Sequence, residues 1–277
     1  MSSPGHVLHF SGPGRWAWDA RMHFADASCA RTHLSSVQRC RDPRDLRFVP
    51  DERVPDGPWL EFAESPFEAS RENARFDAGC DVALIDVPRE IVAMLRAWRH
   101  DTSLAVDEAL QGDARLALEE WLRTIGTPGS FTIHPVRDVQ ADLPTTSYNG
   151  DGLLLGLHLD SWDTLPSRER RTAQNRICIN LGESPRHFVF VPLTISSLAE
   201  AGVITDERLD STVLRTRYYP RLAPMPVVRV RVDPGQTYVA ATENLIHDGS
   251  SLGDSQPATV LTVRGRFDRP LPQRETV

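Results

Sequence analysis

Apolar side chains in the first half of the chain follow the period of a helix at two places. One segment runs from about Pro88 to Arg99, and the other follows Asp113 and stops near Gly126. Proline suits the first turn of a helix and glycine its end. The apolar faces recur at helical spacing, and they consist of Ile91, Leu95 and Trp98, and of Leu118, Leu122 and Ile125. The first 65 or so residues show no clear period, and we expect them to be irregular.

Short apolar or alternating runs replace the helical spacing after Gly129, and Pro, Gly, Asn and Asp separate them. This pattern predicts a series of short strands. The candidate strands are Phe131–Val136, Leu153–Leu159, Arg176–Leu181, His187–Val191, Val227–Val232, Thr237–Ala241, Leu245–His247 and Ala258–Phe267, with a helical insert around 196–201 and 207–218. Many short strands favour an antiparallel sandwich or barrel. We therefore predict a single, mainly β domain with flanking helices over 1–277, with residues 130–270 as its core and 1–129 as an extension whose helices pack on that core.

Residue types that bind metal ions end one of these predicted strands. His158 and Asp160 follow an apolar run, and residues two apart on a strand point to the same face. A second histidine, His247, belongs to a later predicted strand. Two histidines and one carboxylate leave adjacent metal positions open, as in the non-haem Fe(II) oxygenases. Each residue also has a structural interpretation: a histidine of the core, an aspartate that caps a turn, and a histidine beside a surface turn.

The order His158-x-Asp160, then His247, then an arginine in the last predicted strand resembles the Fe(II)/2-oxoglutarate-dependent oxygenase superfamily over about residues 130–270. The resemblance implies a double-stranded β-helix, or jelly-roll, core. It also implies that the three residues hold Fe(II), while 2-oxoglutarate and O2 take the open positions. A guanidinium can bind the far carboxylate of the cosubstrate with two hydrogen bonds. Arg264, with Thr262 on the same face, is our first choice for this role, and Arg266 remains open.

Four other residues are candidates from their place in the chain. Asn180 lies in the strand after the histidine–aspartate pair and could reach the cosubstrate, or it could end that strand beside Gly182. Tyr148, Asn149 and Trp162 flank the pair and could line a substrate pocket, or they could pack a turn.

Composition limits the classes of partner. The chain has 277 residues and a net charge of −7, which disfavours nucleic acid as the main partner. It contains no apolar run long enough to span a membrane and no secretory signal at its start. Its four cysteines show no CxxC pairing. These features predict a cytoplasmic protein with reduced thiols that acts on a small molecule.

We therefore expect an iron-dependent 2-oxoglutarate oxygenase that hydroxylates, desaturates or cyclises a small molecule, such as an amino acid or a natural-product intermediate. Halogenating relatives replace the metal-binding carboxylate, so Asp160 speaks against halogenation. One alternative is a cupin-like metal-dependent dioxygenase or isomerase that does not use 2-oxoglutarate. Another is a jelly-roll module that binds a ligand without catalysis. The sequence does not define the substrate, the oxidised position or the oligomeric state.

Overall fold

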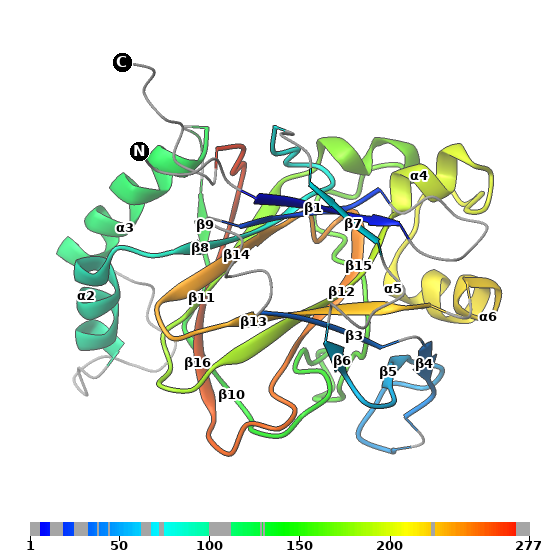
Figure 1. Cartoon of the computed structure of the whole chain (residues 1–277), viewed down its shortest axis with the longest axis horizontal. Coiled ribbons are helices and arrows are strands. Elements are labelled where there is room, and N and C mark those ends of the chain that lie inside the picture. Colours follow the sequence, from blue (N-terminus) through cyan, green and yellow to red (C-terminus); the bar gives the residue numbers. More distant parts are fainter. Residues whose placement is uncertain are drawn as a thin grey trace.

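The computed structural model describes residues 6–11, 19–24, 33–37, 39–43, 45–61, 68–71, 75–99, 112–127, 129, 131–222 and 225–269. These residues form a mainly β protein in which two sheets face each other and helices cover the outside (Figure 1). The mainly β class predicted from the sequence is thus confirmed. No helix in the described ranges is long and apolar enough to cross a membrane.

The larger sheet runs through the middle of the molecule. Its order is β10 (Arg137–Val139), β16 (Ala258–Gly265), β11 (Asn175–Asn180), β14 (Gln236–Ala240), β8 (Val82–Asp86), β2 (Arg21–Phe24), β1 (His6–Ser11) and β7 (Glu68–Arg71), and β9 (Thr132–Ile133) also pairs with β16. The neighbours pair antiparallel, except for the parallel pair of β2 and β8.

The smaller sheet lies against one face of the larger one. Its order is β15 (Leu245–Ser250), β12 (Arg186–Thr194), β13 (Val227–Val232), β3 (Leu34–Val37) and β6 (Leu60–Glu61), and β4 (Arg39–Arg41) pairs separately with β5 (Val54–Asp56). In β13, Val228, Val230 and Val232 are fully buried, while Arg229 and Arg231 lie on the more exposed face. This is the alternation that the sequence predicted.

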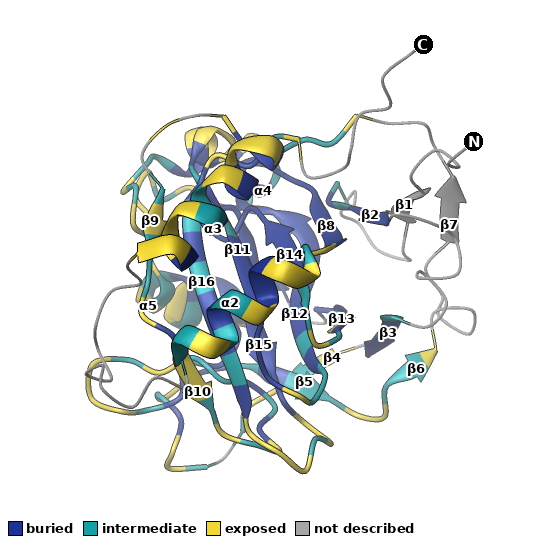
Figure 2. Cartoon of the chain, turned by 90° about the vertical axis from the view of Figure 1, so that its left-hand side faces the viewer, coloured by how far each residue is buried: buried dark blue, intermediate teal, exposed yellow. Residues whose placement is uncertain are grey.

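Two helices cover the outer face of the larger sheet. These are α2 (Arg89–Arg99) and α3 (Gly112–Ile125), which lie across β8, β14, β11 and β16 (Figure 2). Both helices were predicted at these places. The shorter helical segments are η2 (Ser167–Thr172), α4 (Ile195–Glu200), α5 (Ser211–Val213), η3 (Leu214–Tyr218) and α6 (Tyr219–Leu222). The last four overlap the predicted helical insert, but its second part begins at Ser211 and not at residue 207.

Strand β11 shows how the layers divide the core. Ile177 and Ile179 pack toward the helices with Leu118, whereas Cys178 belongs to the cluster between the two sheets with Phe188. Successive side chains of a strand point to opposite faces, so a strand buried on both faces contributes to both clusters. The inner face of the larger sheet therefore lines the space between the sheets.

Several parts of the chain differ from the prediction. The predicted strand Phe131–Val136 is a strand only at Thr132–Ile133, and strands β8 and β10 were not predicted. Residues 153–159 do not form a continuous strand, because Gly156 has a φ of +66° and only isolated pairings occur, at Leu154 and His158. The first 65 residues are not irregular throughout, since β2 belongs to the larger sheet and β3 to the smaller one. Both are four-residue strands, which are too short to show a period. Each also pairs with a strand far away in the sequence, β2 with β8 and β3 with β13.

Candidate metal centre

The backbone itself brings the two histidines together. His158 and His247 form an isolated antiparallel pair in which each N–H donates to the carbonyl oxygen of the other at 2.9 Å. Such a double bond places the two residues directly opposite each other. The N–H of Asp160 donates to the carbonyl of Thr242 at 3.2 Å, which ties the aspartate to the segment that leads into β15.

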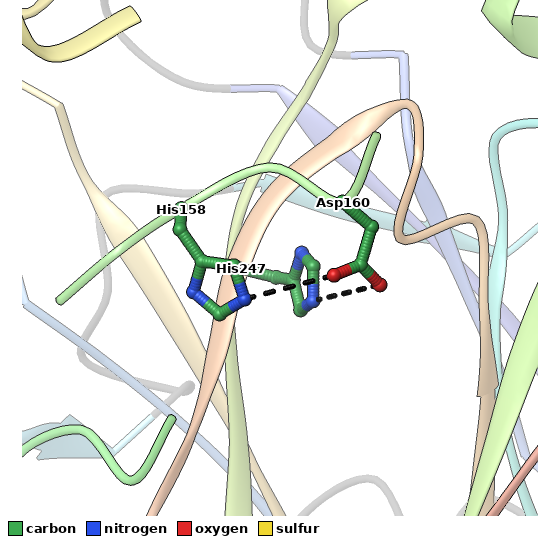
Figure 3. Close-up of side chains that lie close together, drawn as sticks. All are labelled: His158, Asp160 and His247. Carbon is green, nitrogen blue, oxygen red and sulfur yellow. Dashed lines mark ion pairs between the residues drawn. The ribbon is translucent and has the colours of Figure 1, made fainter. Parts of the chain in front are cut away.

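The three side chains then meet at one point (Figure 3). Asp160 Oδ1 lies 3.8 Å from His158 Nε2, and Asp160 Oδ2 lies 3.8 Å from His247 Nε2. One nitrogen or oxygen atom from each residue falls within 4.8 Å of the others, and all three residues are buried. The predicted metal ligands thus converge from distant parts of the chain.

Both imidazoles are held in the same tautomer. His158 Nδ1 lies 3.0 Å from the carbonyl oxygen of Gly156, and His247 Nδ1 lies 2.9 Å from that of Leu245. A carbonyl oxygen only accepts, so Nδ1 must carry the hydrogen in each ring. In the neutral ring the lone pair is then on Nε2, which faces Asp160. Fixing the tautomer through the other ring nitrogen is typical of histidines that bind metals.

The charges around the site favour this donor set. Burial, together with His158 and Arg176, holds the pKa of His247 well below its ordinary value, so the ring is neutral. Burial would raise the pKa of Asp160, but Arg176 and the two histidines outweigh it and lower that pKa, so the carboxylate is charged. A neutral His247 and a charged Asp160 suit a divalent transition metal, which would bind His158 in its deprotonated form. The residues present could therefore hold a divalent metal ion, and Fe(II) is among those that this donor set accepts.

Asp248 supports His158 from behind. Its Oδ2 atom lies 3.5 Å from His158 Nδ1, and its Oδ1 atom accepts hydrogen bonds from the backbone and the hydroxyl of Ser147 at 3.2 and 2.8 Å. Burial disfavours the charged imidazole, but the nearby carboxylates of Asp248 and Asp160 outweigh it and raise the pKa of His158. Asp248 also increases the basicity of this ring as a ligand.

Arg176 lies at the same point as the three ligands. Its Nη2 atom is 2.9 Å from His247 Nε2, and its Nη1 atom is 3.1 Å from Asp160 Oδ2. Arg176 begins one of the strands predicted from the sequence, but we did not connect it with the metal site there. A guanidinium only donates, so this contact agrees with a lone pair on His247 Nε2.

The predicted cosubstrate residues lie at different places. Arg264 faces the space between the sheets opposite Arg176, and it pairs with Asp163 and Glu243. Arg266 follows the end of β16 and is exposed. Thr262 lies two residues from Arg264 on the same face, and its hydroxyl is 3.5 Å from the sulfur of Cys178. Arg264 thus lies between the sheets, whereas Arg266 lies at the surface.

Arg186 is a third arginine between the sheets, and we did not single it out from the sequence. It begins β12, is 4% exposed, and donates to the sulfur of Cys178 at 3.1 Å. Its Nε atom is buried without a hydrogen-bond partner, and no carboxylate of a described residue pairs with it. A buried cation without a counter-ion is costly. The arginine alternates with Phe188 and Phe190 in the sequence, and this pattern was the signal that could have revealed it.

The guanidinium of Arg186 lies beside β15, the strand that carries His247. A Cβ atom added to Gly249 would lie 2.3 Å from Arg186 Nη2 and 2.6 Å from the hydroxyl oxygen of Thr146. Gly249 is two residues from His247 on β15, so both face the same way. Burial would raise the pKa of the nearby Cys178 thiol, but Arg186, Thr262 and Arg176 outweigh it and lower that pKa.

Of the remaining candidates, Asn180 ends strand β11 and Asn149 lies in a turn. The side chain of Asn180 donates to the carbonyls of Ser184 and Val232 at 2.9 and 3.0 Å and accepts from the N–H of Gly182. Asn149 accepts from two backbone N–H groups of its own turn.

Two aromatic candidates lie at the surface. Tyr148 is 44% exposed, and its hydroxyl is 3.4 Å from Gln140 Oε1. Trp162 is 59% exposed, and its ring lies 5.8 Å from the guanidinium carbon of Arg264. Of these two, Trp162 is therefore the one that lies beside a charged residue of the inner sheet face.

Neither a scan against protein-family models nor a search of curated proteins found a match to this chain.

Proposed function

We propose that this protein is an Fe(II)- and 2-oxoglutarate-dependent oxygenase that hydroxylates, desaturates or cyclises a small molecule. The observation that carries the proposal is the convergence of the two imidazoles and one buried carboxylate at a single point. His158, Asp160 and His247 would hold the metal. Fe(II), 2-oxoglutarate and O2 would together supply the oxidant for a C–H bond, and an amino acid or a natural-product intermediate is the substrate we favour.

The order of the strands supports a jelly-roll core for the proposal. After β10 in the larger sheet, the chain pairs with β15 of the smaller sheet at His158 and returns to the larger sheet in β11. Strands β12 and β13 then lie in the smaller sheet, β14 in the larger, β15 in the smaller and β16 in the larger. This alternation between two facing sheets is what a double-stranded β-helix requires.

The charge between the sheets supports an anionic cosubstrate. 2-Oxoglutarate is a dianion, and its far carboxylate needs a fixed cation. Arg264 already has two carboxylate partners, and Arg266 is exposed. Arg186 is buried without a carboxylate partner among the described residues. We therefore propose Arg186 as the anchor, together with the hydroxyl of Thr262, and keep Arg264 as the competing assignment.

The chain's own residues would then divide the work. Asp248 and the carbonyls of Gly156 and Leu245 orient the imidazoles. Burial of the three ligands excludes bulk water from the metal, which protects a reactive site from side reactions. Trp162, exposed beside Arg264, is positioned to contact a substrate that approaches from the surface.

Metal binding is the first test. Protein purified without oxygen is titrated with Fe(II), and the bound metal is measured by elemental analysis after desalting. We expect one Fe(II) per chain, loss of binding in Asp160→Ala, and normal binding in the matched control Asp151→Ala, whose carboxylate is exposed on a turn. Equal binding by both variants, or none by the wild type, would contradict the metal centre.

Cosubstrate binding is the second test. Addition of 2-oxoglutarate to the anaerobic Fe(II) protein should produce a metal-to-ligand charge-transfer absorption. Arg186→Met should weaken 2-oxoglutarate binding by at least about tenfold, the factor that corresponds to loss of one charge-assisted hydrogen bond, with Fe(II) binding retained. If Arg264→Met has that effect and Arg186→Met does not, the anchor is Arg264. Substrate-dependent succinate release then identifies the substrate.

The same two tests separate the alternative functions. A cupin-like dioxygenase or isomerase predicts bound metal without a response to 2-oxoglutarate. A ligand-binding module predicts no stoichiometric metal. The ion pair of Arg176 with Asp160 favours this module, because the carboxylate already has a counter-ion without a metal. The wild-type Fe(II) titration therefore decides between the module and both enzymes.

A further inference from the structure

Arg176 shares its guanidinium between two of the proposed metal ligands. Nη2 donates to His247 Nε2 at 2.9 Å, and Nη1 is 3.1 Å from Asp160 Oδ2. The third nitrogen, Nε, is buried without a hydrogen-bond partner. The side chain is 18% exposed, so the guanidinium lies largely inside the protein.

A metal ion and the Arg176 guanidinium cannot both bind Nε2 of His247 at the same time. The imidazole has one lone pair, on Nε2, and Arg176 occupies it. A metal bound through His247 must therefore release at least Nη2 of Arg176. The metal also takes charge from Asp160, which is the one carboxylate paired with Arg176 in the described part of the chain.

Metal binding does not remove the partners of the neighbouring arginine, Arg264. Arg264 lies directly opposite Arg176 in the pairing of β11 with β16, but its partners are Asp163 and Glu243. Neither of these carboxylates belongs to the proposed metal ligands. Metal binding thus leaves Arg264 neutralised and leaves Arg176 as a largely buried cation in need of an anion.

Resting on the proposed function, we propose that Arg176 is the substrate-recognition residue of this centre and that the substrate carries a carboxylate or a comparable anionic group. Without metal, the guanidinium holds Asp160 and His247 together. With metal bound, it turns to the anionic group of the organic substrate. Arg264 lies opposite it on β16, and the exposed Trp162 lies beside Arg264, where that substrate would enter from the surface.

Metal affinity tests the first half of this exchange. Mn(II), which needs no exclusion of oxygen, is titrated into the wild type, Arg176→Gln and Arg264→Gln, and free Mn(II) is followed by electron paramagnetic resonance. We expect Arg176→Gln to bind Mn(II) about tenfold more tightly, because a charge-assisted hydrogen bond no longer has to be broken. Arg264→Gln should stay within about twofold of the wild type, and Arg176→Lys, which keeps a cation, should bind less tightly than Arg176→Gln. Unchanged or weaker binding by Arg176→Gln would overturn the proposal.

Linkage with an anion tests the second half. Methanesulfonate is a poor metal ligand, so it serves as a probe for the released guanidinium. In the wild type it should tighten Mn(II) binding relative to chloride at equal ionic strength, because binding linkage is reciprocal. The effect should vanish in Arg176→Gln. No tightening in the wild type, or equal tightening in the variant, would contradict an anion site at Arg176.

The outcomes also separate this inference from the proposed function. If Mn(II) binds the wild type and all variants equally, the metal centre stands and the role of Arg176 falls. If neither the wild type nor Arg176→Gln binds Mn(II), while circular dichroism shows both to be folded, the metal centre itself is wrong and the inference falls with it.

Discussion

At the scale of single residues, the candidate centre depends on which ring nitrogen carries the hydrogen. Backbone carbonyls set this for both histidines, and Asp248 adds a carboxylate behind His158. The types of the ligands are therefore a property of the sequence, but their orientation depends on acceptors that no ligand spacing reveals. Gly156 and Leu245 supply these acceptors because each lies two residues before its histidine.

Asp248→Asn should weaken metal binding by about 10- to 100-fold, the usual effect of removing a partner of a metal-bound imidazole. An amide would turn a donor or a weaker acceptor toward the Nδ1–H of His158. The Kd for Mn(II) measures this, and Asp151→Asn, on an exposed turn, is the control. An unchanged Kd in Asp248→Asn would show that Gly156 alone orients the ring.

At the scale of secondary-structure elements, β15 and β12 form the part of the smaller sheet that carries the site. Phe190 of β12 lies opposite His247, and Phe188 lies opposite Gly249. Because residues two apart share a face, Arg186 extends beneath Gly249, where a side chain would collide with it. The glycine thus leaves room for a buried guanidinium.

Gly249→Ala should lower the free energy of unfolding by about 1–3 kcal/mol, as overpacking of a buried site does, and should weaken 2-oxoglutarate binding by displacing Arg186. Urea denaturation and the charge-transfer titration measure the two effects. The control is Gly150→Ala, because a Cβ at Gly150 meets nothing within 4 Å. Equal stability of the two variants would contradict the close packing of Arg186 against β15.

Helix α3 offers a matched pair of leucines for the packing of the outer layer. Leu118 is fully buried against the larger sheet, whereas Leu116, on the same helix, is 65% exposed. Leu118→Ala should therefore lower the free energy of unfolding by about 2–5 kcal/mol, and Leu116→Ala should change it by less than about 0.5 kcal/mol. Comparable losses in urea denaturation would show that α3 packs through another face.

At the scale of the whole molecule, buried groups that lose a charge on folding make stability depend on pH. His187 on β12 is the clearest case away from the metal ligands. Burial, together with Arg229 and Arg231, lowers its pKa to about 3. The unfolded chain, with a histidine pKa near 6.5, therefore binds a proton that the folded protein excludes.

His187 contributes fully to stability at pH values above its pKa in the unfolded chain. This contribution is lost as the pH falls toward its pKa in the folded protein. Between these values the free energy of unfolding should fall by up to about 1.4 kcal/mol per pH unit from this group alone. Chemical denaturation at about pH 7 and about pH 5 in the wild type and in His187→Gln isolates the effect. We expect the wild type to lose more stability than the variant, and parallel losses would show that His187 titrates normally in the folded state.

The sequence predicted the elements whose period is long enough to read. Helices α2 and α3 and strand β13 lie where their apolar faces placed them. The short N-terminal strands were missed, because their pairing with β8 and β13 is decided by contacts with segments far along the chain. The run 153–159 was predicted as a strand from its apolar residues, but Gly156 takes a positive φ beside the carbonyl of Arg53 and interrupts it.

By itself, the sequence determined the chemistry available to this protein: two histidines and a carboxylate in predicted β structure, with arginines nearby, because ligand type is a property of side chains. Only the tertiary structure decided which arginines contact the proposed ligands and which of them have carboxylate partners. Arg176 meets the ligands, Arg264 is neutralised and Arg186 is buried without a carboxylate partner among the described residues. These differences arise from cross-strand neighbours and from burial, and both depend on which distant segments pair.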